Sequence, residues 1–505
     1  MNPTAMTSSG RVRGRVEDGL CVFRGIPFAQ PPVGEARFAA PRPAARWDGV
    51  REALAFGPPP PQTLMGPGGP VPDDTAGDWL TVNVWTPAAD RAAGRPVMVW
   101  IYGGAYQSGS SASPAYTGRR LASESGIVVV TFNYRVGMEG FAAIDGAPAN
   151  RGLLDQVAAL RWVRENIAEF GGDPDRVTLF GESAGAGCIA ALLAMPSAEG
   201  LFHRAIVQSL PGTYFSAALA ADIGTALAGT LGLRPTVADL EAVDPHRLAN
   251  IPVELRPSMP GLAERWGAVA HAVSPFSPVV DGEVLPRSPW RALADGAARE
   301  LPLIVGHNRD EYRLFLILSG RLGQITAEQA SGTLRAFGPG AEPEAAYRAA
   351  YPEASDEKLF ELVQSDWLFR MPSLHLAQAQ LAGGGSAHVY DLTWPAPTRN
   401  GLFGACHALD VPLTFGEIGP FAGPPFQLFD PEPSPEAEAL SGWIRAAWTR
   451  FAAEGAPGWP AYDLDQRLTQ VLDTKIVTAA YPEEASRLLW QDHAFDVLPL
   501  LTAEQ

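Results

Sequence analysis

Short apolar runs alternate along the chain with longer stretches of helical periodicity. The runs contain few polar residues: PVMVWIY (96–102), GIVVVTFNYR (126–135), RVTLF (176–180), LPLIVG (301–306), AHVYDL (387–392) and TQVLD (469–473). Strands with little polar alternation are typically buried on both faces, as in a mostly parallel sheet. The stretch 153–170 predicts an amphipathic helix that ends at Gly171 and Gly172. The pattern therefore predicts an α/β protein, in which helices flank a central, mostly parallel sheet.

Two regions interrupt this alternation. The segments at about 211–300 and about 320–384 are helical and irregular in pattern, and we interpret them as insertions after core strands. The early stretch 14–56 combines strand-like runs with proline-rich turns, which favours an antiparallel edge of the sheet. The sequence shows no internal repeat and no linker rich in Gly, Ser or charge. We therefore expect a single elaborated domain over residues 1–505.

Composition and charge exclude some partners. The 505 residues carry a formal net charge of -17, whereas nucleic acids and anionic membrane surfaces attract basic patches. The N-terminus lacks the apolar core of a signal peptide, and no apolar run is long enough to cross a membrane. Cys21, Cys188 and Cys406 form no even set and no C-x-x-C pair, so a reducing compartment fits best. We expect no nucleic-acid partner, no membrane partner and a cytoplasmic location.

The segment 176–196, RVTLFGESAGAGCIAALLAMP, carries the strongest chemical signal. A predicted strand runs into the pentapeptide GESAG (181–185), and a predicted helix follows it. This pattern is typical of a nucleophile elbow, whose sharp turn needs small residues around the serine and places that serine at a helix N-terminus. The pentapeptide alone is a weak motif in a chain with 52 glycines, but the strand before it and the helix after it make it specific. Ser183 is therefore the predicted nucleophile of an α/β-hydrolase.

Two other interpretations of this segment are weaker. In the first, Ser183 is a plain helix N-cap, a common role of serine. In the second, GAGCIA (185–190) is the G-x-G-x-x-A loop of a dinucleotide-dependent oxidoreductase. The glycines of that loop should lie between strand and helix, yet here they lie inside the predicted helix, and no strand ending in an acidic residue follows at the expected distance.

A serine nucleophile also requires backbone N–H groups that point at the oxygen of the charged tetrahedral intermediate. One donor is the residue after the nucleophile, here Ala184. Others come from a glycine-rich turn after an earlier strand, and YGGA (102–105) follows the first apolar run in that place. No Gly-Lys-Ser/Thr follows, which excludes a phosphate loop. A plain tight turn is the simpler alternative for this segment.

The predicted base follows from the chain order of this class, which is serine, acid, histidine. His407 lies in a loop after the run at 387–392 and fits the last position. His307 is the serious rival among the eight histidines, but it precedes the best acids. A pair between Cys406 and His407 is disfavoured, because adjacent side chains diverge and catalytic pairs are usually remote in sequence.

The predicted acid should follow an intermediate strand. Asp310 and Glu311 come directly after the run at 301–306, and either could orient the imidazole and stabilise the imidazolium. Spacing alone does not choose between these two residues. Asp410, close to His407 in sequence, is a third and more plausibly structural alternative.

These motifs stand in a series of blocks that resembles the type-B carboxylesterase family, which includes bacterial para-nitrobenzyl esterases and the cholinesterases. The blocks cover almost the whole chain in family order: FRGIPFAQPPVGEARFAAPRP (23–43), TVNVWTP (81–87), NRGLLDQVAALRWVRENIAEFGGDP (150–174), GESAG (181–185), FSPVVDG (276–282), NRDEY (308–312) and GACHALDVPLTFG (404–416). The resemblance implies the α/β-hydrolase fold with helical insertions over the active site. The residues it implies are Ser183 as nucleophile, Glu311 rather than Asp310 as acid, His407 as base, Gly103, Gly104 and Ala184 as oxyanion-hole donors, and Ser209 as a serine that supports the triad.

The chain departs from the family pattern at several positions. Tyr102 stands where the family usually has a histidine before the Gly-Gly pair. Leu210 and Pro211 replace the usual glycine after Gln-Ser, at a wall of the family's pocket. Asp78 and Trp79 stand where the Glu-Asp-Cys step of the family's early disulfide usually lies, so we do not expect that disulfide.

The sequence therefore predicts a serine carboxylesterase. His407 takes the proton of Ser183 as the serine attacks the ester carbonyl; the alcohol leaves, and water then releases the acid. The expected small-molecule substrates are uncharged short-chain alkyl or aryl esters, with amides, carbamates and aromatic polyester fragments as alternatives. The sequence contains no H-E-x-x-H motif or clustered ligand set, so we expect no metal and no organic cofactor. A catalytically silent binding module is the rival from another class, weakened by the presence of all three triad residues.

Overall fold

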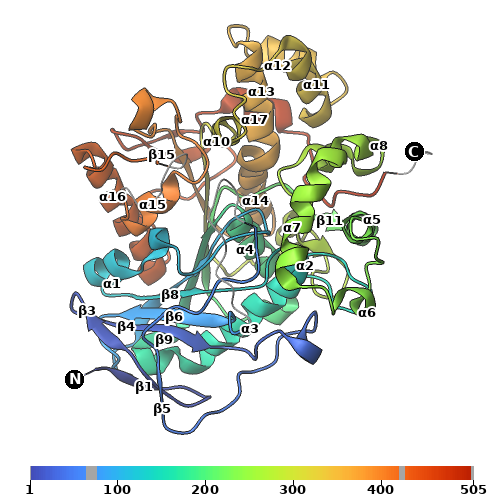
Figure 1. Ribbon diagram of the computed structural model, residues 1–505. Helices are drawn as coiled ribbons and strands as arrows, with labels where there is room; N and C mark the ends of the chain where they lie inside the picture. Colours follow the sequence, from blue (N-terminus) through green and yellow to red (C-terminus); the bar gives the residue numbers. More distant parts are fainter. Residues whose placement is uncertain (1, 64–76, 420–426, 502–505) are drawn as a thin grey trace. The chain divides into compact units, whose positions relative to one another are not determined.

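The computed structural model describes residues 2–63, 77–419 and 427–501 (Figure 1). The chain divides into two units. Unit 1 comprises Met1–Ala205, Thr213–Pro289 and Val497–Gln505, and unit 2 comprises Ile206–Gly212 and Trp290–Asp496. The chain crosses from unit 1 to unit 2 within β10 (Arg204–Gln208) and again at the start of α9 (Pro289–Ala294). The single domain expected over residues 1–505 stays a prediction.

The main sheet of unit 1 contains both parallel and antiparallel strands, in the order β9-β7-β8-β6-β4-β3. β7 pairs in parallel with β8 and β9, whereas β6, β4 and β3 continue antiparallel, which confirms the predicted antiparallel edge. The strands of unit 1 are β1 (Thr4–Met6), β2 (Arg11–Arg13), β3 (Arg15–Glu17), β4 (Leu20–Pro27), β5 (Val50–Glu52), β6 (Thr81–Thr86), β7 (Arg95–Ile101), β8 (Val128–Phe132), β9 (Gly172–Glu182), β11 (Phe215–Ser216) and β12 (Val279–Val280).

The helices of unit 1 include the one predicted at 153–170, which is α3 followed by a short 3-10 turn. The helices are α1 (Arg119–Ser125), α2 (Gly137–Gly140), α3 (Arg151–Asn166), α4 (Ala184–Ala194), α5 (Ala217–Gly229), α6 (Val237–Leu240), α7 (Pro245–Leu255) and α8 (Ala263–Trp266). The last four lie within the first predicted insertion. The start of α7 is coded locally: the helix begins with a proline, and Asp244 caps it by accepting a hydrogen bond from Arg247 N.

Unit 2 is built on parallel strands with helices around them. β13 pairs in parallel with β14, and β14 with β15, while β16 closes the edge antiparallel. The strands are β13 (Leu303–Asn308), β14 (Ala387–Leu392), β15 (Leu468–Leu472) and β16 (Val477–Ala480). The helices are α10 (Arg313–Leu318), α11 (Ala327–Phe337), α12 (Pro343–Ala350), α13 (Asp356–Ser365), α14 (Met371–Ala382), α15 (Asp410–Phe415), α16 (Pro435–Glu454) and α17 (Glu484–Trp490).

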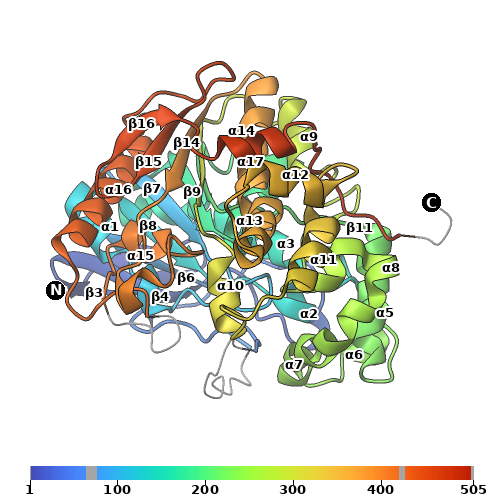
Figure 2. The ribbon, with the colours of Figure 1, turned by 90° about the horizontal axis from the view of Figure 1, so that it is seen from above.

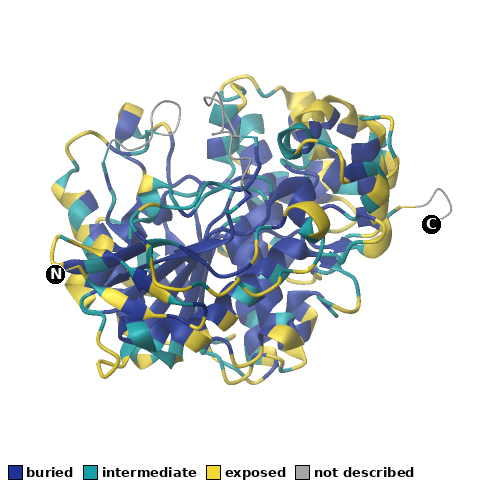
Figure 3. Ribbon diagram, turned by 60° about the horizontal axis from the view of Figure 1, so that its bottom comes forward, coloured by how far each residue is buried: buried dark blue, intermediate teal, exposed yellow. Residues whose placement is uncertain are grey.

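Helices α11, α12 and α13 lie together in Figure 2, and α13 continues through a π-helical turn, Asp366–Arg370, into α14. These four helices occupy most of the second predicted insertion. Figure 3 shows buried positions concentrated in the strands; every residue of β8, β13 and β14 is buried, as their apolar runs predict. Within the described ranges, no helix is long and apolar enough to cross a membrane.

Candidate active site

The turn that contains Ser183 joins β9 directly to α4. Ser183 has φ 56° and ψ -127°, whereas β9 ends at Glu182 and α4 begins at Ala184. A residue with a side chain rarely adopts such a positive φ, which costs of order 1–3 kcal/mol and clusters at functional sites. The Ser183 side chain is partly exposed, while its neighbours on both sides are buried. The structure thus confirms the predicted strand–serine–helix turn, and it places Gly185 and Gly187 inside α4, which contradicts the dinucleotide-loop alternative.

Two glycines make this turn possible. A Cβ atom on Gly181 would lie 2.6 Å from the Ile101 carbonyl oxygen, and one on Gly185 would lie 2.0 Å from the same oxygen. Both distances are far below van der Waals contact, so the end of β7 fills the space that larger side chains would need. The G-x-S-x-G spacing therefore reflects the crowding of the turn against β7.

The glycine-rich turn after β7 lies against the serine. A Cβ atom on Gly103 would lie 2.7 Å from the Glu182 carbonyl oxygen and 3.0 Å from Ser183 Cβ. Gly104 has φ +120°, and a Cβ there would lie 2.2 Å from the Ser108 carbonyl oxygen. Glycine is needed at both positions, because the backbone of this turn approaches its neighbours too closely for any side chain. This turn is the segment predicted to supply oxyanion-hole donors.

Tyr102 and Tyr134 support this turn from behind. Their rings stack with centroids 4.4 Å apart, and both residues are fully buried. Tyr134 Oη donates a hydrogen bond of 2.6 Å to the Tyr102 carbonyl, and Tyr102 Oη donates one of 3.3 Å to the Tyr134 carbonyl. Because carbonyl and following N–H point in opposite directions across a trans peptide, the first bond aims the Gly103 N–H away from Tyr134. Sequence reasoning recognised the unusual Tyr102 but missed Tyr134, whose only signal was its position just after β8.

The predicted acid and base meet in unit 2. His407 Nδ1 lies 2.6 Å from Glu311 Oε2, and His407 N donates a bond of 3.3 Å to the Glu311 carbonyl. The other carboxylate oxygen, Glu311 Oε1, accepts from Ser209 Oγ at 2.6 Å and from Asn308 N at 2.8 Å. Glu311 and Ser209 are fully buried, and Ser209 has a positive φ of 56°. A carboxylate on Nδ1 leaves Nε2 as the nitrogen that can accept a proton.

Two phenylalanines flank the imidazole. Phe369 stacks on His407 with ring centroids 4.1 Å apart, and Phe315 lies at 5.3 Å with a tilt of 36°. Phe369 belongs to the π-helical turn between α13 and α14, a feature that often marks functional sites. The two rings restrict rotation of the imidazole about its side-chain bonds. Sequence reasoning did not identify Phe369, because nothing local in the sequence signals a contact so distant along the chain.

Asp310, the alternative acid, is bonded to the backbone just before His407. Asp310 Oδ2 accepts a hydrogen bond of 3.1 Å from Ala405 N, and Asp310 N donates one of 2.9 Å to the Ala405 carbonyl. Its Oδ1 accepts one of 3.0 Å from Lys358 Nζ. Burial alone would raise the pKa of Asp310, but the positive charges of Lys358, Arg313 and Arg309 outweigh it and lower the pKa to about 2. Asp310 is therefore ionised and fastens the loop that carries His407.

The remaining alternatives have structural partners. His307 is buried in β13 with Nε2 2.9 Å from Tyr481 Oη, and burial lowers its pKa to about 3. Asp410 Oδ2 accepts hydrogen bonds from Gln208 Nε2 at 2.7 Å and from Tyr390 Oη at 2.8 Å. These contacts favour a packing role for both residues. Across the described part of the chain, no group of three or more His, Cys, Asp or Glu residues is arranged to hold a metal ion.

Comparisons with known proteins agree with one another. A model of the carboxylesterase family matches residues 1–484. The chain is 36% identical over 493 residues to para-nitrobenzyl esterase of Bacillus subtilis, covering 95% of this chain and 97% of that one. It is 35% identical over 480 residues to phenmedipham hydrolase of Pseudarthrobacter oxydans, covering 92% and 93%. Among solved structures, a carboxylesterase of Geobacillus stearothermophilus matches with a TM-score of 0.83 and 36% identity, over 97% of this chain and 100% of that one.

Proposed function

Because the chain belongs to the carboxylesterase family and is a carboxylic-ester hydrolase with the α/β-hydrolase fold, we propose that Ser183, His407 and Glu311 are its catalytic triad. The contact of 2.6 Å between His407 Nδ1 and buried Glu311 carries this proposal. A buried carboxylate on that nitrogen fixes the tautomer and stabilises the imidazolium that forms when the base accepts a proton. The strained elbow supports Ser183 as the nucleophile, since it holds the serine at the start of α4.

The proposed reaction is acyl transfer in two steps. Ser183 Oγ attacks the ester carbonyl while His407 Nε2 takes its proton, and the same proton then passes to the departing alcohol. Water, deprotonated by His407, attacks the acyl-enzyme carbonyl; the bond to Ser183 Oγ then breaks, His407 returns the proton to Ser183 Oγ, and the carboxylic acid is released. The N–H groups of Gly103, Gly104 and Ala184 would stabilise the negative oxygen in both steps. The reaction as proposed uses protein groups and water.

The proposed substrates are uncharged short-chain alkyl and aryl esters. The name of the Bacillus subtilis relative supports esters whose alcohol part carries an aromatic ring, and the name of the Pseudarthrobacter oxydans relative makes phenmedipham the second substrate to test. A cytoplasmic location is also part of the proposal. It is supported by Cys21, Cys188 and Cys406, all of which are free thiols and would persist in a reducing compartment.

Hydrolysis of para-nitrophenyl acetate, butyrate and octanoate tests the proposal, with wild type beside Ser183→Ala. We expect kcat of Ser183→Ala to fall by about 10⁶, as for removal of other serine nucleophiles. Ser123→Ala, on the exposed side of α1, is the matched control and should keep the wild-type rate. Equal activity of wild type and Ser183→Ala would refute Ser183 as nucleophile.

Covalent labelling separates catalysis from silent binding. A fluorophosphonate should add one mass increment to the wild-type peptide that contains Ser183, and none to Ser183→Ala. The catalytically silent alternative predicts no adduct in either protein, because an unactivated serine does not react. Phenmedipham in the same kinetic assay then tests the second substrate, with Ser183→Ala again as the blank.

A further inference from the structure

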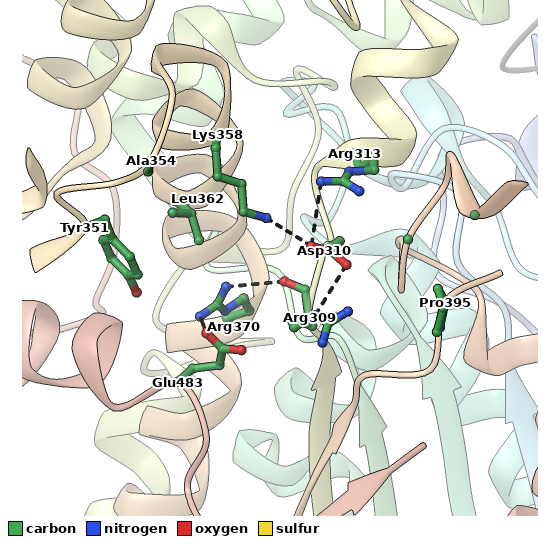
Figure 4. A pocket seen from close by; sticks show the side chains of 12 residues that line it. Arg309, Asp310, Arg313, Tyr351, Ala354, Lys358, Leu362, Arg370, Pro395 and Glu483 are labelled. Atoms are coloured by element: carbon green, nitrogen blue, oxygen red, sulfur yellow. Dashed lines mark hydrogen bonds and ion pairs between the residues drawn. The ribbon is translucent and has the colours of Figure 1, made fainter. Parts of the chain in front are cut away.

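Unit 2 contains a pocket of about 470 Å³ whose lining is rich in charged side chains (Figure 4). Four of the lining residues are cationic, namely Arg309, Arg313, Lys358 and Arg370, whereas two are carboxylates, Asp310 and Glu483. Figure 4 shows Lys358 and Arg313 pointing at Asp310 from different elements. The proposed ester hydrolysis gives these cations no role beyond keeping Asp310 ionised.

Three of the four cations lie nearer to solvent than the carboxylates that pair with them, whereas Arg370 is buried and the side chain of its partner Glu483 is 17% exposed. The exposed fractions are 40% for the Arg309 side chain, 35% for Lys358 and 24% for Arg313. The corresponding values are 7% for Asp310 and 3% for Glu361. The carboxylates therefore balance the charge of the cluster from the buried side. A solute that enters the pocket meets the ammonium and guanidinium groups first.

Several of these donors are not used by the protein. Arg309 approaches Asp310 only through Nε, at 3.5 Å, and its two Nη groups have no hydrogen-bond acceptor within the described part of the chain. Arg313 uses Nε and Nη2 on Glu361, which leaves Nη1. Lys358 donates to Asp310 and Glu361 and retains a third proton. The opening thus offers unshared N–H donors on three cations.

A buried arginine holds the base of the pocket in place. Arg370, at the end of the π-helical turn, is fully buried. Its Nη2 donates a bond of 2.7 Å to Glu483, and its Nη1 donates one of 3.3 Å to the Arg309 carbonyl. The backbone that carries Arg309 is therefore fixed before any ligand arrives. Preorganised donors lower the entropic cost of binding.

We propose that this pocket is a second binding site, which takes a small polyanion bearing phosphate or several carboxylates through Arg309, Arg313 and Lys358. Guanidinium groups bind the oxygens of both ligand types in paired, charge-assisted hydrogen bonds. Leu362 and Pro395 add apolar lining that suits a short organic part of such a ligand. The inference concerns binding alone, so it stands or falls independently of the proposed ester hydrolysis.

Isothermal titration calorimetry of the full chain tests this site with two probes, sodium pyrophosphate and sodium citrate, at constant ionic strength set by sodium chloride. We expect saturable binding of at least one probe. Saturation by pyrophosphate alone identifies phosphate chemistry, and saturation by citrate alone identifies carboxylate chemistry. Absence of saturation with both probes overturns the proposal, because the pocket then shows no preference for a polyanion over chloride.

Substitutions locate the binding. Arg309→Gln removes the cation with the most unused donors, and we expect it to raise Kd about tenfold, as for loss of one charge-assisted hydrogen bond. Lys358→Gln should raise Kd similarly. Arg335→Gln, an exposed arginine on α11 in the same unit, removes the same charge at a distance and should leave Kd unchanged. Equal Kd in wild type, Arg309→Gln and Lys358→Gln overturns the site.

Arg309→Gln is a safe variant for this purpose. The Arg309 side chain is 40% exposed, and its guanidinium makes only the weak contact of 3.5 Å to Asp310 within the described residues. The fold should therefore persist in this variant. A melting temperature close to that of Arg335→Gln would show that the fold is intact. If Arg309→Gln melts early, Lys358→Gln decides the matter alone.

Discussion

The groups proposed to carry the chemistry are held by different means in the two units. In unit 1, Ser183 is positioned by backbone: a positive φ of 56° and glycines at 181 and 185 that pack against β7. In unit 2, His407 is positioned by side chains: the carboxylate of Glu311 on one ring nitrogen and the ring of Phe369 on one face. The turn of Ser183 is thus fixed by crowding, and the imidazole of His407 is fixed by hydrogen bonding and stacking.

The two strategies respond differently to substitution. A substitution in a crowded backbone is strongly disruptive, because there is no free space for an added methyl group and the turn itself must move. A substitution that removes a side-chain hydrogen bond costs the free energy of that bond, typically about 1.5–3 kcal/mol when one partner is charged. The surroundings of His407 should therefore tolerate shape changes better than charge changes, and the turn around Ser183 the reverse.

Glu311→Gln is the largest test of the side-chain strategy. The amide keeps the shape of the carboxylate but favours the wrong imidazole tautomer, and kcat should fall by about 10⁴. The measurement is kcat for para-nitrophenyl butyrate, with protein folding checked by melting temperature. Glu328→Gln, exposed on α11, is the matched control and should be silent. A kcat of Glu311→Gln within about tenfold of wild type would point to another acid.

Gly103→Ala is the corresponding test of the backbone strategy. Its methyl group would lie 2.7 Å from the Glu182 carbonyl oxygen and 3.0 Å from Ser183 Cβ, so the turn must move away from the serine. If Gly103 donates to the oxyanion, kcat should fall by about 10²–10³ with a smaller change in KM. Gly229→Ala, at the end of α5, meets no atom within 4 Å and should keep wild-type kinetics. A wild-type kcat in Gly103→Ala would rule out a role for this turn in stabilising the oxyanion.

The sequence was sufficient to predict those elements whose pattern lies within one short segment of the chain. The predicted strands recur as β7, β8, β9, β13, β14 and β15, and the elbow was readable because strand, serine and helix are contiguous. β10 was missed, since RAIVQ is short and gives little periodicity. The choice between Asp310 and Glu311 was impossible from spacing because the two residues are adjacent. In the fold, Glu311 contacts the imidazole and Asp310 the backbone of Ala405.

Contacts between distant segments explain the other omissions. Phe369 stacks on His407 from a π-helical turn, and no sequence pattern signals that the turn exists or where its ring points. Ser209 was identified only through family resemblance, and its hydrogen bond of 2.6 Å to Glu311 agrees with a supporting role. Residues that act through contacts between distant segments are therefore the ones that the sequence alone does not reveal.

Asp310→Asn tests how much the ionised carboxylate of Asp310 contributes to the stability of the fold. The pKa of Asp310 is lowered to about 2, against an ordinary value of 3.8, so the folded state favours the ionised form. This difference corresponds to about 2 kcal/mol of stability, which is fully present above the ordinary pKa and is lost as pH falls through the lowered one.

Urea denaturation of wild type and Asp310→Asn at several pH values measures this effect. Wild type should be more stable by about 2 kcal/mol near neutral pH, and the difference should begin to shrink below about pH 4. Asp356→Asn, whose partly exposed ion pair with Arg348 lies in the same unit, should cost much less. A difference between wild type and Asp310→Asn that stays constant with pH would show that lost packing, and not charge, is responsible.

Tyr134→Phe makes the smallest change and separates the two strategies within unit 1. It removes only the hydroxyl that donates 2.6 Å to the Tyr102 carbonyl and leaves the stacked ring in place. If that bond aims the Gly103 N–H, its loss, of about 1 kcal/mol, should lower kcat about fivefold with KM unchanged. Tyr102→Phe loses two longer bonds of 3.3 Å, one donated to the Tyr134 carbonyl and one accepted from Tyr134 N, and neither involves the Tyr102 carbonyl, so it should affect kcat less. A lower melting temperature with unchanged kcat in Tyr134→Phe would assign the hydroxyl to folding alone, and the turn 102–105 would then owe its geometry to glycine crowding without help from a side chain.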